Sequence, residues 1–262
     1  MDVVYHGSNM HGLESLEPRK STHGRYVYAT PSKVLAVLFS GRCGDDLTYS
    51  LGHFDFDRNG PWELVENIPG AFEKMFSNSS SIYTLDASNF RDLNSGFREV
   101  VSEEKVDVLD EEQYDSVYEA VFKLEEEGLL KIYRYPDKPQ SLKQDGSDIL
   151  DKFRKYKNEL NIDIGKRDFE RLVYLHPSLL PQINDLATEL GFKFQFKKTD
   201  ILRIFKERVR TQLRNPDREQ YIDSSYQAIC EYDPEYGEII EPLYTHYKIR
   251  MERKQKSNGF RI

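Results

Sequence analysis

The chain has little cysteine, with only Cys43 and Cys230 among its 262 residues. Two cysteines are too few for the disulfide framework of a small secreted domain or for a zinc site built from cysteines. The sequence also lacks a hydrophobic run near the roughly 18 residues that span a bilayer. Its first residues, 1–6, have neither the basic start nor the apolar core of a secretion signal. We therefore expect a cytoplasmic protein with no membrane partner and no bound metal.

Aromatic residues are plentiful, with 17 Tyr and 15 Phe, and such a composition excludes intrinsic disorder. Charge is distributed unevenly. Residues 1–140 hold 14 Lys and Arg against 25 Asp and Glu, a net −11, whereas residues 141–262 hold 23 against 20, a net +3. A polar stretch at 137–149 separates these parts. We therefore predict two regions, 1–136 and 148–262.

Short runs of β-forming residues dominate the first region, and helical periodicity dominates the second, so the sequence predicts an α+β class. Strands are expected at 3–5, 26–29, 81–85, 99–102, 105–109 and 129–133. Helices are expected from Thr30, as N-cap, to Gly41, from Asp110 to about Glu127, and at 148–160, 166–175, 181–190 and 200–214, with a short strand suggested at 192–196.

Residues 197–214 are the most basic stretch, with seven basic and two acidic residues. Ile201, Phe205 and Val209 recur every four positions, which indicates an amphipathic helix with one cationic face. Such a face is usually only solvated, and the sequence pI near 5.4 weighs against nucleic acid as a partner. Nucleic-acid contact by the 197–214 helix is therefore an open but less favoured alternative.

Three segments place polar side chains where predicted strands begin or end. They are Tyr5-His6-Gly7-Ser8, then Tyr26-Val27-Tyr28-Ala29-Thr30 with Ala36 and Phe39 on the following helix, and then Arg98-Glu99-Val100-Val101-Ser102. In this order the segments resemble the ADP-ribosyltransferase fold, in the His-Tyr-Glu branch that diphtheria-type toxins share with poly(ADP-ribose) polymerases. The resemblance covers about residues 1–136. It implies a split antiparallel β-sheet there. The mostly helical region after it, 148–262, lies outside the resemblance, and we expect it to recognise the target or to regulate the enzyme.

The resemblance implies a mono-ADP-ribosyltransferase that consumes NAD as a substrate and transfers ADP-ribose to an unknown protein or nucleic-acid acceptor. Breaking the bond between nicotinamide and ribose gives an oxocarbenium-like transition state, which a nearby carboxylate stabilises. By the resemblance, Glu99 supplies this catalytic carboxylate. An intracellular transferase of this kind would damage its host, which suggests a toxin or a phage-defence effector.

The resemblance also assigns residues to NAD. Tyr28 would stack on the nicotinamide, the main chain of Gly7 would hold its carboxamide, and His6 would hydrogen-bond the adenosine ribose. Ser8 would line the nicotinamide pocket, and the set of expected NAD-binding residues is completed by Ala29, Thr30 and Phe39.

Several alternatives stay open at this stage. Glu103 and Glu104 lie close to Glu99 and compete with it for the catalytic role. The chain could also be an inactive module that binds NAD, ADP-ribose or a protein, or an NAD-dependent RNA 2′-phosphotransferase, although the second histidine expected of that enzyme is missing. Phe97 occupies the position where arginine-modifying relatives have Glu or Gln, which disfavours arginine as the acceptor.

Overall fold

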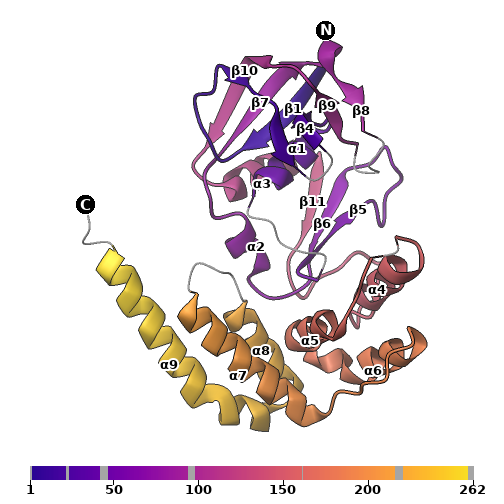
Figure 1. The fold of residues 1–262 in the computed structure, drawn as a ribbon, viewed down its shortest axis with the longest axis vertical. Helices are drawn as coiled ribbons and strands as arrows, with labels where there is room; N and C mark the ends of the chain where they lie inside the picture. Colours follow the sequence, from indigo (N-terminus) through magenta and orange to yellow (C-terminus); the bar gives the residue numbers. More distant parts are fainter. Residues whose placement is uncertain are drawn as a thin grey trace. The chain divides into compact units, whose positions relative to one another are not determined.

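A computed structural model describes residues 2–21, 24–41, 47–93, 98–160, 162–215 and 221–258, and its fold is mixed α+β (Figure 1). The chain divides into two compact units. The β unit consists of residues 1–44, 51–64 and 72–132, and the helical unit consists of residues 45–50, 65–71 and 133–262. Among the described residues, no helix combines the length and the hydropathy needed to cross a bilayer.

The β unit contains two four-stranded antiparallel sheets. The first has the order β1 (Val3–Ser8), β7 (Ser80–Asp86), β10 (Val106–Tyr114), β2 (Ser15–Leu16). The second has the order β3 (Arg19–Ser21), β4 (Gly24–Ala29), β9 (Val100–Ser102), β8 (Arg91–Asp92). A third, three-stranded sheet has the order β11 (Leu130–Tyr133), β6 (Trp62–Glu66), β5 (Tyr49–Gly52).

A single β-bridge links the first two sheets. Tyr5 N donates to Thr30 O at 2.8 Å, and Thr30 N donates to Tyr5 O at 2.9 Å. On either side of this bridge the strands pair elsewhere, β1 with β7 and β4 with β9. The sheets therefore diverge from this one point.

One face of β1 and β7 changes from apolar to polar along the strands. Val4 pairs with Leu85 in the buried core, and the next pair on the same face is His6 with Tyr83. Because side chains alternate between faces, Gly7 lies on the opposite face, where helix α1 (Lys33–Ser40) packs against β1.

Two predicted helix starts are wrong. Helix α1 begins at Lys33 with Ser32 as its N-cap, since Ser32 Oγ accepts from Leu35 N, whereas Thr30 stays in the bridge to β1. Residues 110–114 continue strand β10, and helix α3 (Val117–Glu126) begins only after the Ser116 cap. The strand prevails because its acidic side chains find donors there: Glu111, for example, accepts from Tyr83 OH at 3.0 Å.

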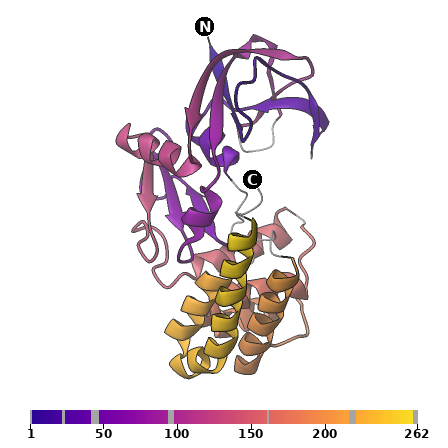
Figure 2. The ribbon, with the colours of Figure 1, turned by 90° about the vertical axis from the view of Figure 1, so that its left-hand side faces the viewer.

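In the second region, the four predicted helices agree with the structure to within two residues at each end. The helical unit contains α4 (Asp148–Asn158), α5 (Lys166–Leu175), α6 (Leu180–Glu189), α7 (Lys198–Arg214), α8 (Ile222–Tyr232) and α9 (Pro234–Asn258), and a short α2 (Ala71–Met75) lies earlier in the chain. The last three helices lie side by side (Figure 2). The strand suggested at 192–196 is absent among the described residues, because its phenylalanines pack edge-on instead: Phe192 and Phe194 both contact Phe169.

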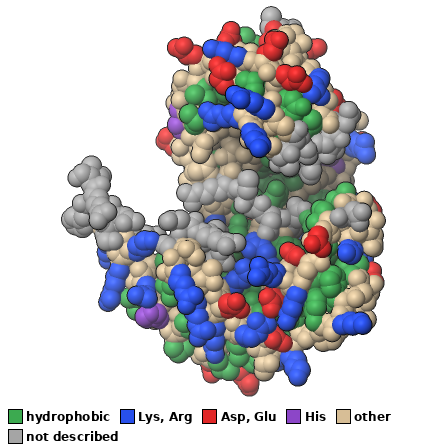
Figure 3. Space-filling model, in the orientation of Figure 1, with side chains coloured by type: hydrophobic (Ala, Val, Ile, Leu, Met, Phe, Trp, Pro, Cys, Tyr) green, Lys and Arg blue, Asp and Glu red, His purple; other side chains and the backbone are tan. Residues whose placement is uncertain are grey.

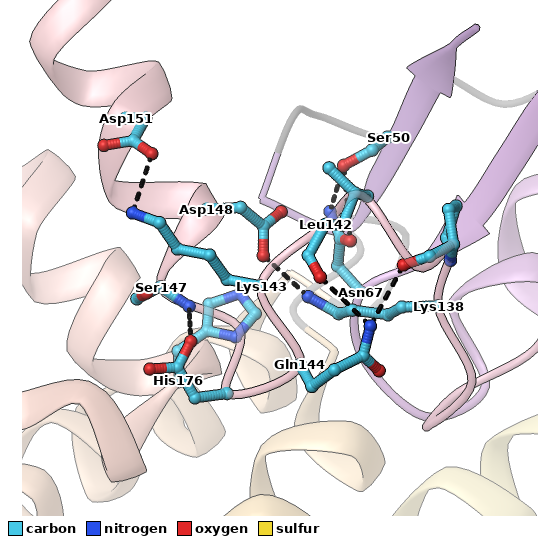
Figure 4. Close-up of polar contacts among 12 residues, drawn as sticks. Ser50, Asn67, Lys138, Leu142, Lys143, Gln144, Ser147, Asp148, Asp151 and His176 are labelled. Carbon is cyan, nitrogen blue, oxygen red and sulfur yellow. Dashed lines mark hydrogen bonds and ion pairs between the residues drawn. The ribbon is translucent and has the colours of Figure 1, made fainter. Parts of the chain in front are cut away.

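Polar side chains tie two earlier segments of the chain into the helical unit (Figure 4). Asn67 Nδ2 donates to Ser50 Oγ at 3.1 Å, and Lys152 Nζ donates to the same oxygen at 2.9 Å. Lys138 and Asp148 form a nearly buried ion pair at 2.8 Å. His176 is buried, and its Nε2–H donates to Leu47 O at 2.9 Å.

Acid should destabilise the helical unit through His176. Burial lowers the pKa of His176 from 6.5 to about 4, although the hydrogen bond to Leu47 partly opposes the shift. Between pH 6.5 and 4 the unfolded state therefore binds more protons than the folded state, so the free energy of unfolding falls as the pH falls. The loss is about 3 kcal/mol over this window.

This prediction is tested by urea unfolding of the wild-type protein and of His176→Gln at pH 7 and pH 4.5. Gln keeps an N–H donor for Leu47 but does not titrate, so the variant should lose less stability on acidification than the wild type. Equal losses would show that other groups cause the acid sensitivity.

Candidate functional site

A cavity of about 290 Å³ lies within the β unit. Ligand pockets are commonly about 300–1,000 Å³, so this one suits a small ring with an attached sugar. Seven of the eight predicted site residues line it, namely His6, Gly7, Tyr28, Ala29, Thr30, Phe39 and Glu99. The other lining residues are Tyr5, Ser21 and Ala36.

His6 presents one defined nitrogen for a ligand. Its Nδ1 lies 2.7 Å from Tyr28 O, and because a carbonyl only accepts, Nδ1 must carry the proton. Burial lowers the pKa of His6, the hydrogen bond to Tyr28 raises it, and the charge of Arg19 lowers it, with a net decrease. The imidazole is therefore neutral at pH 7, and its Nε2 is an acceptor suited to a hydroxyl group.

Gly7 is required by packing as well as by the cavity. A Cβ at this position would overlap the carbonyl oxygen of Ala36 and would lie 2.9 Å from Ser40 Cβ. The glycine therefore allows helix α1 to lie close against β1. Ser8 is not among the residues that line the cavity, and its Oγ accepts from Met10 N at 3.1 Å, within the turn that follows the strand.

Tyr28 carries a buried hydroxyl that has no hydrogen-bond partner within the described part of the chain. Its ring meets Tyr26 edge-on, with the centroids 5.9 Å apart. A buried hydroxyl without a partner costs about 1–3 kcal/mol.

Helix α1 supplies the apolar wall of the cavity. Thr30 Oγ1 accepts from Ser32 N at 3.2 Å and so shapes the turn from β4 into the helix. Ala36 is buried, and Phe39, three residues further along, is 48% exposed. A large aromatic side chain left exposed beside a cavity offers a flat surface to a ring.

Glu99 is the acid of the cavity. It directly precedes Val100, which pairs with Ala29 of β4, and no hydrogen bond or ion pair of its side chain occurs among the described residues. The preceding residue, Arg98, has a left-handed backbone (φ 53°), and its guanidinium lies 5.9 Å from the ring centre of Trp62.

The two competing glutamates lie away from the cavity. Glu103 accepts from Arg91 at 3.0 Å in an exposed ion pair, and Arg91 also donates to Tyr26 OH. Glu104 is exposed, and neither residue is part of the cavity wall. Of the three candidates, only Glu99 is placed to act on a ligand there.

The cavity therefore combines aromatic rings, a neutral acceptor nitrogen and one carboxylate without an ion-pair partner in the described chain. It can hold a planar ring and a sugar, and it can stabilise a positive charge that develops beside the carboxylate. No group of three or more potential metal ligands occurs among the described residues.

Sequence reasoning missed Tyr5 and Ser21 as lining residues. In the structure Tyr5 forms the backbone bridge to Thr30, and Ser21 is one of several polar residues of a short edge strand. The type of neither residue therefore indicates, from the sequence, that its side chain lines a cavity. Cys43 and Phe97, which entered the sequence analysis, lie outside the described residues.

Comparisons of the chain with protein-family models, with curated proteins and with solved structures give no significant match.

Replacing Gly7 by alanine should destabilise the β unit, because the new methyl group would meet the backbone of α1. We expect a loss of about 1–3 kcal/mol, as for other overpacked sites, measured by urea unfolding followed by Trp62 fluorescence. Gly165→Ala is the matched control, since the nearest atom to its added Cβ is 4.0 Å away. An unchanged stability of Gly7→Ala would contradict the packing role.

Replacing Tyr28 by phenylalanine should raise the free energy of unfolding by about 1 kcal/mol, because it removes a buried hydroxyl that lacks a partner. Tyr83→Phe is the control. Its hydroxyl has two hydrogen-bond partners, Met10 O at 2.8 Å and Glu111 Oε1 at 3.0 Å, so the loss of that hydroxyl should destabilise the protein. If Tyr28→Phe also destabilises the protein, the Tyr28 hydroxyl has a partner in solution.

Proposed function

We propose that the chain is an NAD-consuming ADP-ribosyltransferase of the His-Tyr-Glu type, with its active site in the cavity of the β unit. One observation carries the proposal. His6, Tyr28 and Glu99 come from three separate segments of the sequence, and all three line one cavity. This is the arrangement that the resemblance to the family requires. It also supports a split antiparallel sheet of the ADP-ribosyltransferase kind, since the two sheets touch at one bridge.

In this proposal Glu99 acts on the ribose that bears the nicotinamide. The C–N bond between them breaks and its electron pair leaves with nicotinamide, so positive charge develops on the ribose. A carboxylate that has no competing cation beside it stabilises this charge most effectively. Glu99 is such a group within the described residues. The acceptor then bonds to the ribose carbon and loses a proton, or water takes its place and free ADP-ribose results.

The remaining wall residues bind and orient the substrate. The Tyr28 ring offers a stacking surface for nicotinamide, and Phe39 lies exposed on the helix that forms another wall. His6 Nε2 accepts from a ribose hydroxyl, because its Nδ1–H is already committed to the Tyr28 carbonyl.

Glu99→Gln should abolish most NAD cleavage while NAD binding remains. The amide keeps the size of the side chain but not its charge, so we expect nicotinamide release to fall by at least about 100-fold, as for other losses of transition-state stabilisation. Release is measured by liquid chromatography and mass spectrometry, and NAD binding by calorimetry.

Glu103→Gln is the matched control, because Glu103 lies outside the cavity wall, and it should cleave NAD as the wild type does. Equal turnover by the wild type and Glu99→Gln would contradict the assignment of Glu99. Binding of NAD by a wild-type protein that releases no nicotinamide would identify an inactive binding module instead.

A further inference from the structure

Positive charge is concentrated in two short segments near the end of the chain. Residues 197–214 and 246–262 together hold 13 Lys and Arg against three Asp and Glu, a net +10. The whole chain has a net charge of −8, so the remaining residues carry −18. Like charges held close together repel one another and destabilise the fold, so a cluster of this size suggests that these residues bind an oppositely charged partner.

The first half of α7 does not provide a free cationic surface. Lys198 pairs with Asp233, next to the start of α9. Arg203 pairs with Asp200 and with Glu170, both at 3.1 Å. The cationic face predicted for the 197–214 helix is therefore largely neutralised over this half.

The last turns of α7 and α9 lie at the same end of the three-helix layer. The Lys198–Asp233 pair joins the start of α7 to the start of α9. At the other end, α8 begins eight residues after α7 ends. There Asp223 of α8 accepts from Tyr244 of α9 at 3.1 Å and pairs with Lys248 at 3.4 Å. Helices α7 and α9 thus run in the same direction and end together.

Five exposed cations gather at this end, and we call them the basic end. They are Arg210 and Arg214 on α7, and Arg250, Arg253 and Lys256 on α9. Spacings of three and four residues place these side chains on one side of each helix. The structure shows no ion-pair partner for any of them among the described residues, and Lys and Arg side chains are visible among other residues on this part of the helical unit in Figure 3.

We propose that the basic end binds the phosphate backbone of nucleic acid. Four of the five cations are arginines, whose planar guanidinium groups match phosphate oxygens two at a time. A lipid surface fits less well. A membrane-bound amphipathic helix inserts its apolar face, but here the larger part of these faces is packed in the core: Phe205 and Val209 of α7 and Ile240 of α9 are fully enclosed, although Ile249 of α9 is 44% exposed.

This proposal goes beyond the NAD site and does not depend on it. Contacts to phosphates release counterions, so the affinity must fall steeply as salt rises. It must also be largely independent of base sequence, since the basic end consists of charged groups that reach phosphates rather than a recognition element for base edges.

The test is fluorescence anisotropy of the full chain with a labelled 20-base-pair DNA duplex and a labelled 20-nucleotide RNA, over a series of salt concentrations. At physiological salt we expect a Kd of about 10⁻⁶–10⁻⁴ M, typical of binding through phosphates. Arg250→Glu/Arg253→Glu should weaken binding at least about tenfold and reduce the salt slope by about two. Arg210→Glu/Arg214→Glu should do the same from the α7 side.

Lys155→Glu/Arg167→Glu is the matched control, with the same change of charge at two other exposed positions of the helical unit, and it should bind nearly as the wild type does. Circular dichroism checks that all the variants are folded. The proposal is wrong if the control loses as much affinity as the two basic-end variants, if either basic-end variant binds normally, or if the wild type binds anionic vesicles but neither nucleic acid.

Discussion

The bridge between Tyr5 and Thr30 is the constraint on which the β unit depends. These residues share two backbone hydrogen bonds, and beyond them β1 and β4 belong to different sheets. The backbone N–H and C=O groups of a strand need hydrogen-bond partners. Where β1 and β4 separate, β7 therefore supplies the partners for β1 and β9 supplies those for β4. The three proposed catalytic-site residues follow from this. His6 is next to Tyr5, Tyr28 lies two residues before Thr30, and Glu99 precedes the residue that pairs with Ala29. This short contact therefore helps to bring His6, Tyr28 and Glu99 to one cavity, and helix α1 supplies another part of its wall.

Local sequence patterns were sufficient to predict a helix or strand where its surroundings in the fold agree with the intrinsic preference of its residues. The strand at 81–85 and the helix at 166–175 were predicted correctly, because a composition rich in β-forming residues marks the first and apolar periodicity marks the second. The first half of β10 was predicted as a strand, but its second half, residues 110–114, was predicted wrongly as a helix start. The sequence Asp110-Glu111-Glu112 is typical of a helix start, but in the fold Glu111 accepts from Gly12 N and Tyr83 OH, and Glu112 pairs with Lys33. Those donors lie 28 to 99 residues away, so no local window contains them.

Some residues of the candidate site could likewise be identified from the sequence, and others could not. The sequence could nominate His6 and Tyr28 because each lies in a short motif, but it could not choose among Glu99, Glu103 and Glu104, since three nearby glutamates have the same propensity and the same charge. The choice comes from strand pairing, which places Glu99 in the cavity wall and leaves Glu103 beside Arg91. For Gly7 the sequence identified the residue but not its structural role. The residue was predicted, but its visible role is the close approach of α1, which requires the helix to be in place.

The distribution of charge separates the two proposed ligands. The β unit holds 12 Lys and Arg against 21 Asp and Glu, a net −9. NAD carries two phosphates, so this net charge opposes its approach at long range. At physiological ionic strength the Debye length is about 8 Å, and binding in the cavity must therefore depend on short-range contacts such as those of His6. A nucleic acid would be repelled by this unit far more strongly, because its charges repeat along the polymer. The basic end of the helical unit is the surface with charge of the required sign and density for such a polymer.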